Sequence, residues 1–411
     1  MESTAKRLWN RDFLLLIVGQ VISIFGNMIL SFALALYVLD FSESPAIYGL
    51  VSGIPYFSLI AMSPIGGILA DRLKKQRIMF WLDAATTAII IGYMAISGIA
   101  EAIVPIILLK LLALKAIQGI YLPTVQSSVH LLIPYDNLAV GNAAVGIVNS
   151  LSTMVGLSVA GILYGRFGLF PILTISAICF AITAVMDLLI RIPHKKQIVK
   201  GSVSQIIFSD VSRSVRFAIN EKPTLAICAV IAFLLVTLLN AMLIGGIPVL
   251  LVQHLGLGME MVGVNQSIIM LGAIAGGVAA GAFGIHLSIP KSLIFLMFGG
   301  ICLIPVGVVL QFNVSAFASY AIITTSGVLI VFALQLFNIV AVTFVQKETP
   351  TELVGKVLSI LMMLPYLANA TGQLLYGVLF DYFAALPWIV VFCAAALSVA
   401  ISIYSRRFFK R

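Results

Sequence analysis

Long runs of apolar residues dominate the chain, and short polar breaks separate them. Each run is about 20 residues long, which is enough for one helix to cross a hydrocarbon layer of about 30 Å. The runs lack the alternation of apolar and polar residues that a half-buried strand needs. The pattern therefore predicts membrane-spanning helices at residues 13–38, 46–70, 78–99, 103–123, 138–164, 169–190, 224–252, 259–285, 292–311, 315–344, 353–380 and 386–405.

The two ends of the chain repeat one another. A shift of 216 residues places Pro134 on Pro350 and Gly156 on Gly372, so that the fifth predicted span matches the eleventh in a single register. A shift near 213 relates the first two spans to the seventh and eighth in the same way. An even number of spans in each copy gives both copies the same orientation. We therefore expect an all-α membrane protein whose twelve transmembrane helices form two parallel six-helix halves.

The longest polar interruption lies between the two copies, at residues 191–223. Apolar residues near helical spacing in its middle, with Arg213 and Arg216 opposite, predict an amphipathic helix that lies along the membrane surface. The expected domains are an N-terminal six-helix half at residues 1–190, this linker, and a C-terminal half at residues 224–411. Parallel repeats of this kind place a solute site at their interface near the middle of the bilayer.

Composition and charge agree with a lipid environment. Of 411 residues, 61% are hydrophobic and 9% are charged, which is more apolar surface than one soluble core can bury. The formal net charge is +9, but the 24 basic residues are distributed by side of the membrane and do not form a nucleic-acid-binding domain. Most of them fall in loops on one side, whereas the opposite loops contain Arg166. The positive-inside rule then places both termini in the cytoplasm.

The loop between the second and third spans carries the sequence GGILADRLKKQR at residues 66–77. It resembles the G-x-L-A-D-R-x-G-R-K signature of the Major Facilitator Superfamily, with Lys74 in place of the second glycine. A basic loop after a span is also an ordinary topology signal. The resemblance implies a latch that holds one conformation of the transporter. Its residues would be Gly67, Asp71, Arg72 and Lys75.

Weaker motifs along most of the chain resemble the macrolide-efflux and enterobactin-exporter branch of that superfamily. LKAIQG at residues 114–119 and GLSVAG at residues 156–161 resemble degraded drug-transporter and antiporter elements. The resemblance implies a bacterial cytoplasmic (inner) membrane protein that functions as a monomer. It would export small molecules in exchange for protons that flow inward down their gradient, and it would need no cofactor. Asn27 stands where related exporters often carry an acid, which removes one group that could titrate.

Three charged residues inside the predicted spans are candidates for energy coupling: Asp83, Lys110 and Lys115. A lone ionised residue at the helix centre costs roughly 2.5 to 3.5 kcal/mol on insertion scales, so each needs a partner, water or a function. The depths of Asp83 and Lys115 permit an ion pair, with either a coupling or a structural role. Lys110 either faces an aqueous cavity or reaches a polar neighbour. Asp187 is expected to form a local pair with Arg191.

Polar side chains recur at helical spacing on single faces of several spans. Steps of three, four or seven residues align them, so they either line a solute cavity or join neighbouring helices. The proposed cavity residues are Gln20, Asn27, Asn149, Asn240, Gln335, Asn338, Asn369 and Gln373.

The sequence favours secondary active export of amphipathic small molecules, such as a drug, macrolide or siderophore-like compound. The alternative is a facilitator or importer of a metabolite or lysolipid without proton coupling, since the last six spans hold almost no ionisable residue. An enzyme is disfavoured, because no nucleophile–histidine or metal-ligand spacing appears. The expected partners are a small-molecule substrate and the lipid bilayer, with no nucleic acid and no metal.

The charge distribution makes a direct prediction about topology. Green fluorescent protein fused to either end should fluoresce, and alkaline phosphatase fused to either end should be inactive, because loops rich in Lys and Arg stay in the cytoplasm. Fluorescence and phosphatase activity of the fusions measure this. Ends found on opposite faces of the membrane would rule out an even number of spans.

Overall fold

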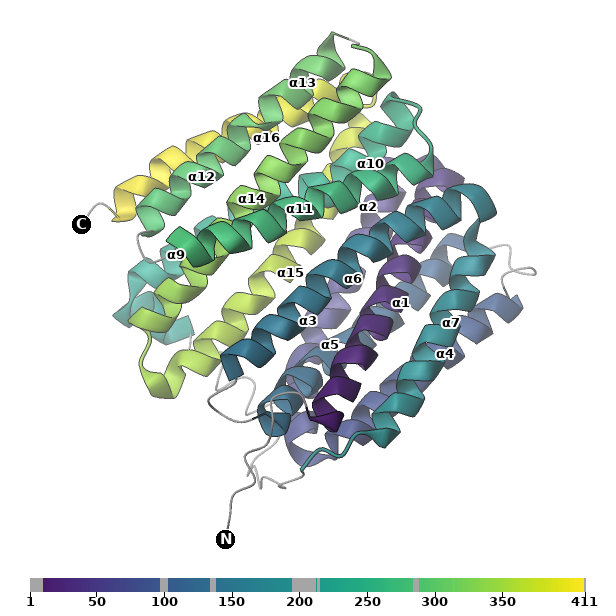
Figure 1. The fold of residues 1–411 in the computed structure, drawn as a ribbon. Helices are drawn as coiled ribbons and strands as arrows, with labels where there is room; N and C mark the ends of the chain where they lie inside the picture. The colour runs from purple at the N-terminus through teal and green to yellow at the C-terminus, as the bar shows by residue number, and fades with distance from the viewer. Residues whose placement is uncertain are drawn as a thin grey trace. The chain divides into compact units, whose positions relative to one another are not determined.

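The computed structural model describes residues 10–96, 103–133, 138–193, 212, 215–283, 288–312 and 314–409, and no β-strand occurs among them. The described chain is almost entirely helical (Figure 1). The helices before the predicted linker are α1 (Arg11–Ser42), α2 (Pro45–Gly53), α3 (Pro55–Arg72), α4 (Lys75–Ile96), α5 (Ile103–Leu132), α6 (Leu138–Phe167) and α7 (Leu169–Leu189).

The second part of the chain begins with one irregular helix followed by longer regular ones. The π-helical and short segments are η2 (Phe217–Glu221), α9 (Pro223–Leu235), η3 (Val236–Asn240), η4 (Met242–Gly246), α10 (Ile247–Val249) and η5 (Leu250–His254). The remaining helices are α11 (Met259–Phe283), α12 (Ile289–Ile301), α13 (Leu303–Gln311), α14 (Ala316–Glu348), α15 (Thr351–Tyr382), α16 (Pro387–Ser405) and the 3₁₀ turn η7 (Arg406–Phe409).

The described residues contain 12 helical segments that are long and apolar enough to cross a membrane. This confirms the predicted number of spans and the all-α fold class. Some spans consist of two helices in series, as for Pro45–Arg72, which includes α2 and α3. The amphipathic helix predicted within residues 191–223 lies mostly outside the described residues.

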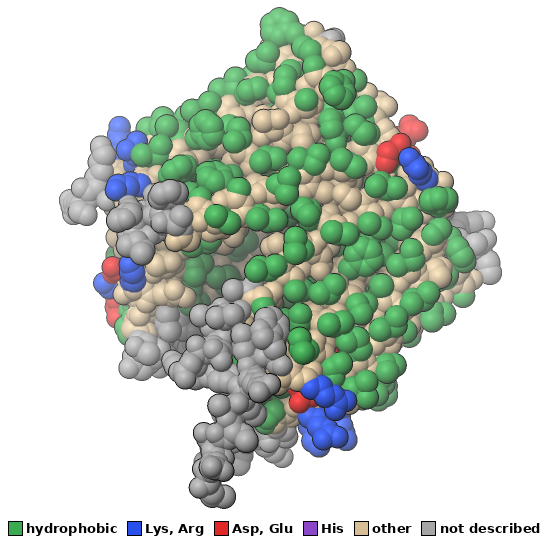
Figure 2. Space-filling view, in the orientation of Figure 1, with side chains coloured by type: hydrophobic (Ala, Val, Ile, Leu, Met, Phe, Trp, Pro, Cys, Tyr) green, Lys and Arg blue, Asp and Glu red, His purple; other side chains and the backbone are tan. Residues whose placement is uncertain are grey.

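Large apolar side chains stand outward along the helices. Trp81, Leu109, Val278 and Phe317 each expose two thirds or more of their surface. In Figure 2 hydrophobic side chains occupy most of the visible helix surfaces, and few charged side chains lie among them. Such an apolar surface would be a liability in water but is suited to lipid.

Contacts between Cα atoms divide the chain into two compact units. Unit 1 contains residues 1–37 and 57–203, and unit 2 contains residues 38–56 and 204–411. The chain leaves unit 2 close to a break in the second span, where α2 ends at Gly53 and α3 begins at Pro55. Proline removes one backbone donor, so the helix is weakened at that point. The predicted domain boundaries remain a prediction.

The seventh span, Pro223–His254, is wound more widely than an α-helix over most of its second half. Pro248 has no N–H group and cannot donate to the carbonyl of Ile244 four residues earlier. The hydroxyl of Tyr48 donates to this carbonyl instead, at 3.1 Å. Tyr376 donates in the same way to the carbonyl of Leu238 at 2.6 Å. These hydroxyls donate the hydrogen bonds that water would donate in a soluble protein, because lipid contains no donors.

Glycines allow α11 and α14 to pack with their backbones in contact. A Cβ atom added at Gly272 would overlap the carbonyl oxygen of Val328, and one added at Gly276 would lie 2.7 Å from the carbonyl oxygen of Phe332. The two glycines are four residues apart and so share one face of α11. This is the small-xxx-small packing that membrane helices use when dispersion forces hold them together.

The glycine contact predicts which substitutions destabilise the second unit. Gly272→Ala or Gly276→Ala should lower the free energy of unfolding by about 1–3 kcal/mol, because α11 and α14 must separate. Gly277→Ala is the matched control: no heavy atom among the described residues lies within 4 Å of its added Cβ. Alanine there should be neutral or stabilising by up to about 1 kcal/mol. Thermal unfolding in detergent measures the difference. Equal effects at Gly276 and Gly277 would contradict the packing.

Candidate solute cavity and buried charges

A cavity of about 340 Å³ opens within unit 2 between α9, η3, α11, α14 and α15. Its wall is mainly aliphatic and includes three amide side chains. Three of the residues predicted to line a cavity, Asn240, Gln335 and Asn338, are part of it. None of its lining residues carries a charge. The lining residues are Leu225, Cys228, Ala229, Ala232, Val236, Asn240, Met270, Ala273, Val331, Leu334, Gln335, Phe337, Asn338, Ala341, Val342, Val345, Leu358, Leu361, Met362, Leu364 and Pro365.

A hydrogen bond fixes the amide of Asn240 in the cavity wall. Its Nδ2 donates to Oδ1 of Asn369 on α15, 2.8 Å away. Asn240 is the last residue of η3, where the wide helical turns begin. Wide turns of this kind occur often at functional sites. Asn369 is buried behind Asn240 and so orients it from the second layer of side chains.

Gln373 lies apart from the cavity, although the sequence places it on the same face as Asn369. It is buried in the packing of α15 against α2 and η4, where its side chain would contact a Cβ on Gly245 at 3.3 Å. Its Nε2 atom has no hydrogen-bond partner among the described residues. The difference arises because α2 covers this turn of α15, and its glycines Gly49 and Gly53 bring the two backbones together.

The other predicted cavity residues belong to unit 1. Gln20 is buried, and its Nε2 donates to the hydroxyl of Tyr121 at 3.1 Å. Asn27 accepts a hydrogen bond from Ser31 at 3.1 Å, and Asn149 is exposed on α6. A solute-facing role for Asn27 and Asn149 stays a prediction. Gln20 instead forms its hydrogen bond with Tyr121 inside unit 1.

The ion pair expected between Asp83 and Lys115 is not formed. The ammonium group of Lys115 donates to Oε1 of Gln118 at 2.9 Å. Asp83 points instead toward α7, where its carboxyl interacts with Asp187. Similar depth in the membrane was the basis of the expectation, but depth does not fix the direction in which a side chain leaves its helix. A salt bridge in the described part of the chain joins Lys222, just before α9, to Glu348 at the end of α14.

Asp187 also differs from its predicted role. Helix α7 ends at Leu189, and Ile190 is extended, so Arg191 is not one helical turn beyond Asp187 and cannot form an i,i+4 pair. Arg191 is exposed, whereas Asp187 retains only 3% of its surface. Asp187 is therefore a second buried acid on the inner face of α7 and does not extend to the membrane surface.

Lys110 is buried against an aromatic ring. Only 4% of its surface is exposed, and its Nζ atom lies 4.0 Å from the centre of the Tyr93 ring. Nζ has no hydrogen-bond partner among the described residues. A cation on the face of a phenol gains roughly 0.5–2 kcal/mol, which offsets part of the burial cost. The sequence left open whether Lys110 faces an aqueous cavity or a polar neighbour, and the structure places it against the aromatic ring of Tyr93 on α4.

The predicted latch forms a compact turn, but a different glycine makes the close approach. A Cβ on Gly67 would meet no heavy atom of the described residues within 4 Å, whereas one on Gly66 would lie 2.6 Å from the Cα of Ile120 on α5. The helix therefore turns Gly66, and not Gly67, toward its neighbour. Asp71 is exposed, and Lys75 beside it donates to the carbonyl of Ala70 at 2.6 Å.

The missing second glycine of the signature does not prevent the turn. Leu73 and Lys74 alone separate α3 from α4. Lys74 has a negative φ, which any residue can adopt, because among the described non-glycine residues the positive φ occurs at Glu43. Lys75 stabilises the turn because its ammonium group satisfies a carbonyl at the C-terminal end of α3. Arg72 completes the last turn of α3, and a latch role for these residues stays a prediction.

Sequence patterns did not identify the tyrosines whose hydroxyls bond to the backbone of the seventh span. They also did not show that Asp187 is buried. Tyr48 and Tyr376 lie in apolar surroundings, where aromatic residues are expected for packing alone. The signal available in the sequence was Pro248, which implies an unpaired carbonyl at Ile244 but does not say which donor reaches it.

Comparisons with known proteins agree with this architecture. A family model described as Major Facilitator Superfamily matches residues 16–373. Macrolide efflux protein A of Streptococcus pyogenes is 23% identical over 185 residues. This match covers 45% of the chain and 46% of that protein, so the chain spans about half the length of the curated relative.

Solved transporters share the fold at low sequence identity. A point mutant of the nucleoside transporter NupG gives a TM-score of 0.77 at 16% identity, over 98% of this chain and 100% of that chain. A D-xylose–proton symporter gives 0.72 at 11% identity, over 96% of both chains. A bacterial homologue of the lysosomal transporter Spinster gives 0.73 at 14% identity, over 99% and 98%. With twelve spans and a family model that matches most of its length, this chain is a membrane transporter, not an enzyme, and belongs to the Major Facilitator Superfamily.

Proposed function

We propose that this transporter exports amphipathic small molecules by alternating access, with protons moving inward in exchange. The observation that carries the proposal is the cavity of unit 2, which combines a long apolar wall with three amide side chains and no charge. Its volume, about 340 Å³, lies within the usual range for small-molecule sites. A bacterial cytoplasmic membrane with both termini inside, and a monomeric working state, belong to the same proposal.

The chemistry of the cavity favours uncharged or weakly polar solutes. A phosphate or a carboxylate placed there would lose its water and find no basic side chain among the lining residues, which is costly. Apolar faces of a solute would displace water from the aliphatic wall at about 25 cal/mol per Å². Amides both donate and accept hydrogen bonds, so a few of them accommodate many arrangements of hydroxyl and carbonyl groups. The likeness to a macrolide efflux protein supports the same class of solute.

The packing of α2 on α15 suggests how access changes. Gly49 and Gly377 bring the two backbones together, with 2.9 Å between an added Cβ on one and the Cα of the other. Two helix surfaces that meet at glycines have no interlocking side chains there, so they can separate without any side chain changing its position. The break at Ile54 and Pro55 would let α2 move apart from α3. In this proposal the parallel repeats rock about the solute site, and the turn between α3 and α4 holds one of the two states.

A facilitator or importer is the alternative, and one observation favours it. No carboxyl, amine, guanidinium or imidazole group lines the cavity, so the cavity has no side chain suited to exchange protons near neutral pH. The structural neighbours include nucleoside, sugar and peptide transporters, so the shared fold is compatible with either import or export. Export coupled to protons therefore requires a proton site elsewhere in the chain.

Export predicts a protective phenotype. A drug-sensitive bacterial host that expresses the chain should tolerate several-fold higher concentrations of macrolides, and an uncoupler should abolish accumulation differences in the same cells. Drug accumulation measured with and without the uncoupler gives the direct readout. Greater accumulation in expressing cells, unaffected by the uncoupler, would support the facilitator instead.

The cavity predicts which amides bind the solute. Gln335→Met and Asn338→Leu keep the side-chain size but remove hydrogen bonds, each worth about 0.5–1.5 kcal/mol, so affinity should fall by about two- to tenfold. Equilibrium binding of radiolabelled erythromycin to purified protein measures this. Gln311→Met is the control, because Gln311 is exposed at the end of α13 and outside the cavity. Unchanged affinity in both cavity variants would move the site elsewhere.

A further inference from the structure

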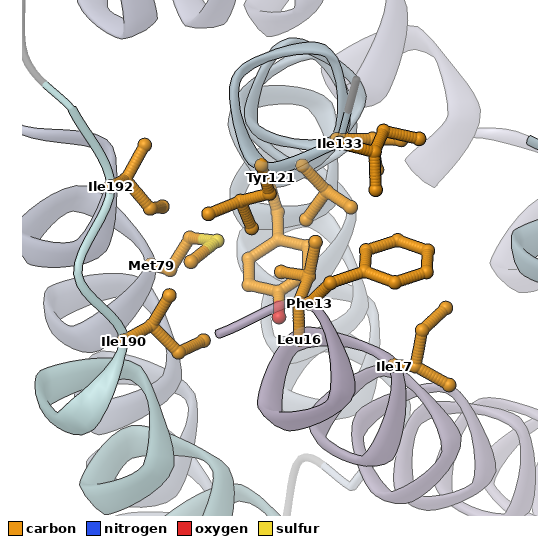
Figure 3. Packing of buried hydrophobic residues seen from close by; sticks show 11 residues of the cluster. Phe13, Leu16, Ile17, Met79, Tyr121, Ile133, Ile190 and Ile192 are labelled. Atoms are coloured by element: carbon orange, nitrogen blue, oxygen red, sulfur yellow. The ribbon is translucent and has the colours of Figure 1, made fainter. Parts of the chain in front are cut away.

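An apolar layer closes one end of unit 1. Side chains from α1, α4, α5 and the end of α7 pack there without charge. Figure 3 shows the ring of Tyr121 between Met79 and Phe13, with its phenol oxygen directed toward α1. The layer consists of Phe13, Leu16, Ile17, Met79, Tyr121, Val125, Val129, Leu132, Ile133, Ile190 and Ile192.

A polar layer lies one helical turn further in on the same helices. Gln20 follows Leu16 by four residues on α1, and Asp83 follows Met79 by four on α4. Residues four apart lie above one another on a helix face, so each polar group is directly beneath an apolar one. Asp187 precedes Ile190 by three residues in the same manner. The apolar layer thereby separates this polar layer from that end of the unit.

The polar side chains of this layer lie near enough to one another to interact electrostatically. The phenol oxygen of Tyr121 accepts a hydrogen bond from Gln20 at 3.1 Å and interacts with both carboxyl groups. Because Gln20 is the donor in that bond, the proton of the phenol remains available for a carboxylate. The hydroxyl of Thr183 lies within reach of Asp83, and the two acids interact with each other.

Both acids are almost completely buried and incompletely bonded. Asp83 and Asp187 retain 2% and 3% of their surface, and Oδ2 of each has no hydrogen-bond partner among the described residues. Neither forms a salt bridge within the described chain.

The neighbouring cations are directed elsewhere. On α5, Lys115 donates to Gln118 and Lys110 lies on the Tyr93 ring. Arg191 lies beyond the end of α7 and is exposed. The groups of α1 that form hydrogen bonds with Tyr121 beside the pair, Gln20 and Ser23, are uncharged. The charge of the two carboxyl groups is thus not balanced by a described side chain.

We propose that Asp83 and Asp187 form a proton-binding pair, in which a proton from water forms an O–H bond with a carboxylate oxygen and leaves again as that bond breaks. Two buried carboxylates that interact with each other cannot both remain ionised away from water, so at least one of them holds a proton while the apolar layer excludes water. Entry of water past the apolar layer would stabilise the ionised forms and release it. As the coupling site this pair rests on the proposed export function, and it supplies the proton site that the solute cavity lacks.

The surroundings favour a proton over a metal ion. The described residues contain no group of three or more His, Cys, Asp or Glu side chains that could hold a metal. The remaining polar atoms around the pair come from one phenol, one amide and hydroxyl groups, which can donate to carboxylates. A sodium ion is the outcome that would reassign the site.

Infrared difference spectroscopy of the purified full chain tests the pair without any solute. Titration over about pH 4 to 10 should show the carbonyl band of a protonated, water-excluded carboxylic acid, and [4-¹³C]aspartate labelling should shift it. The wild type should titrate in two steps, since the acids interact. Asp83→Asn and Asp187→Asn should each leave one step, and the double variant none. Asp381→Asn, which changes an exposed acid, should keep both.

Three results would overturn the proposal. The first is the absence of a labelled aspartic acid band at every pH in the wild type, which needs no variant to fold. The second is a band that persists in the folded double variant, with folding checked by thermal unfolding. The third is loss of the band on adding sodium chloride, but not choline chloride, at constant pH.

Transport separates this proposal from the export function. In proteoliposomes that carry erythromycin, Asp83→Asn and Asp187→Asn should retain solute exchange and lose at least tenfold of pH-driven accumulation. Full accumulation in both variants would exclude the pair from coupling. No erythromycin flux in the wild type, with the two infrared steps intact, would contradict macrolide export alone and leave the proton-binding pair standing.

Discussion

Lipid offers no hydrogen bonds, and every polar group within the spans must find its partner inside the protein. The seventh span shows the consequence for the backbone, since the hydroxyls of Tyr48 and Tyr376 donate to carbonyls of its widened stretch. Asn240 lies in the same irregular stretch and is held by Asn369. The irregular winding therefore both places an amide in the cavity wall and depends on tyrosines from other helices.

In the proposed mechanism, the same constraint separates solute binding from proton binding. The cavity of unit 2 has an apolar wall with amides and no charge, which suits a solute that partitions between water and lipid. The buried charges of the membrane interior described here lie in unit 1, where Asp83 and Asp187 face each other under an apolar layer. Separate sites allow the solute to vary widely without disturbing the groups that would handle protons.

Hydropathy was sufficient for the twelve spans, because each span must satisfy its own backbone within about 20 apolar residues. The structure brings Asn240, Gln335 and Asn338, three of the residues predicted to line a cavity, to the wall of one cavity, and their contact with a solute stays a prediction. Neither a motif nor the depth of a residue in the membrane decides which side of a helix faces a partner. The signature motif therefore favoured Gly67 over Gly66, and equal depth paired Asp83 with Lys115. The end of α7 at Leu189 separated Arg191 from Asp187, and such ends depend on tertiary packing.

The location of the solute is the central claim, and photoaffinity labelling tests it most directly. Purified protein would be irradiated with a diazirine-bearing macrolide and the labelled residues mapped by mass spectrometry, with unlabelled macrolide as competitor. Competable labels should fall on the cavity walls of α9, α14 and α15, for example at Cys228, Gln335 or Met362. Competable labels confined to the apolar outer groove between α9 and α16, at residues such as Val230 and Tyr404, would contradict the account.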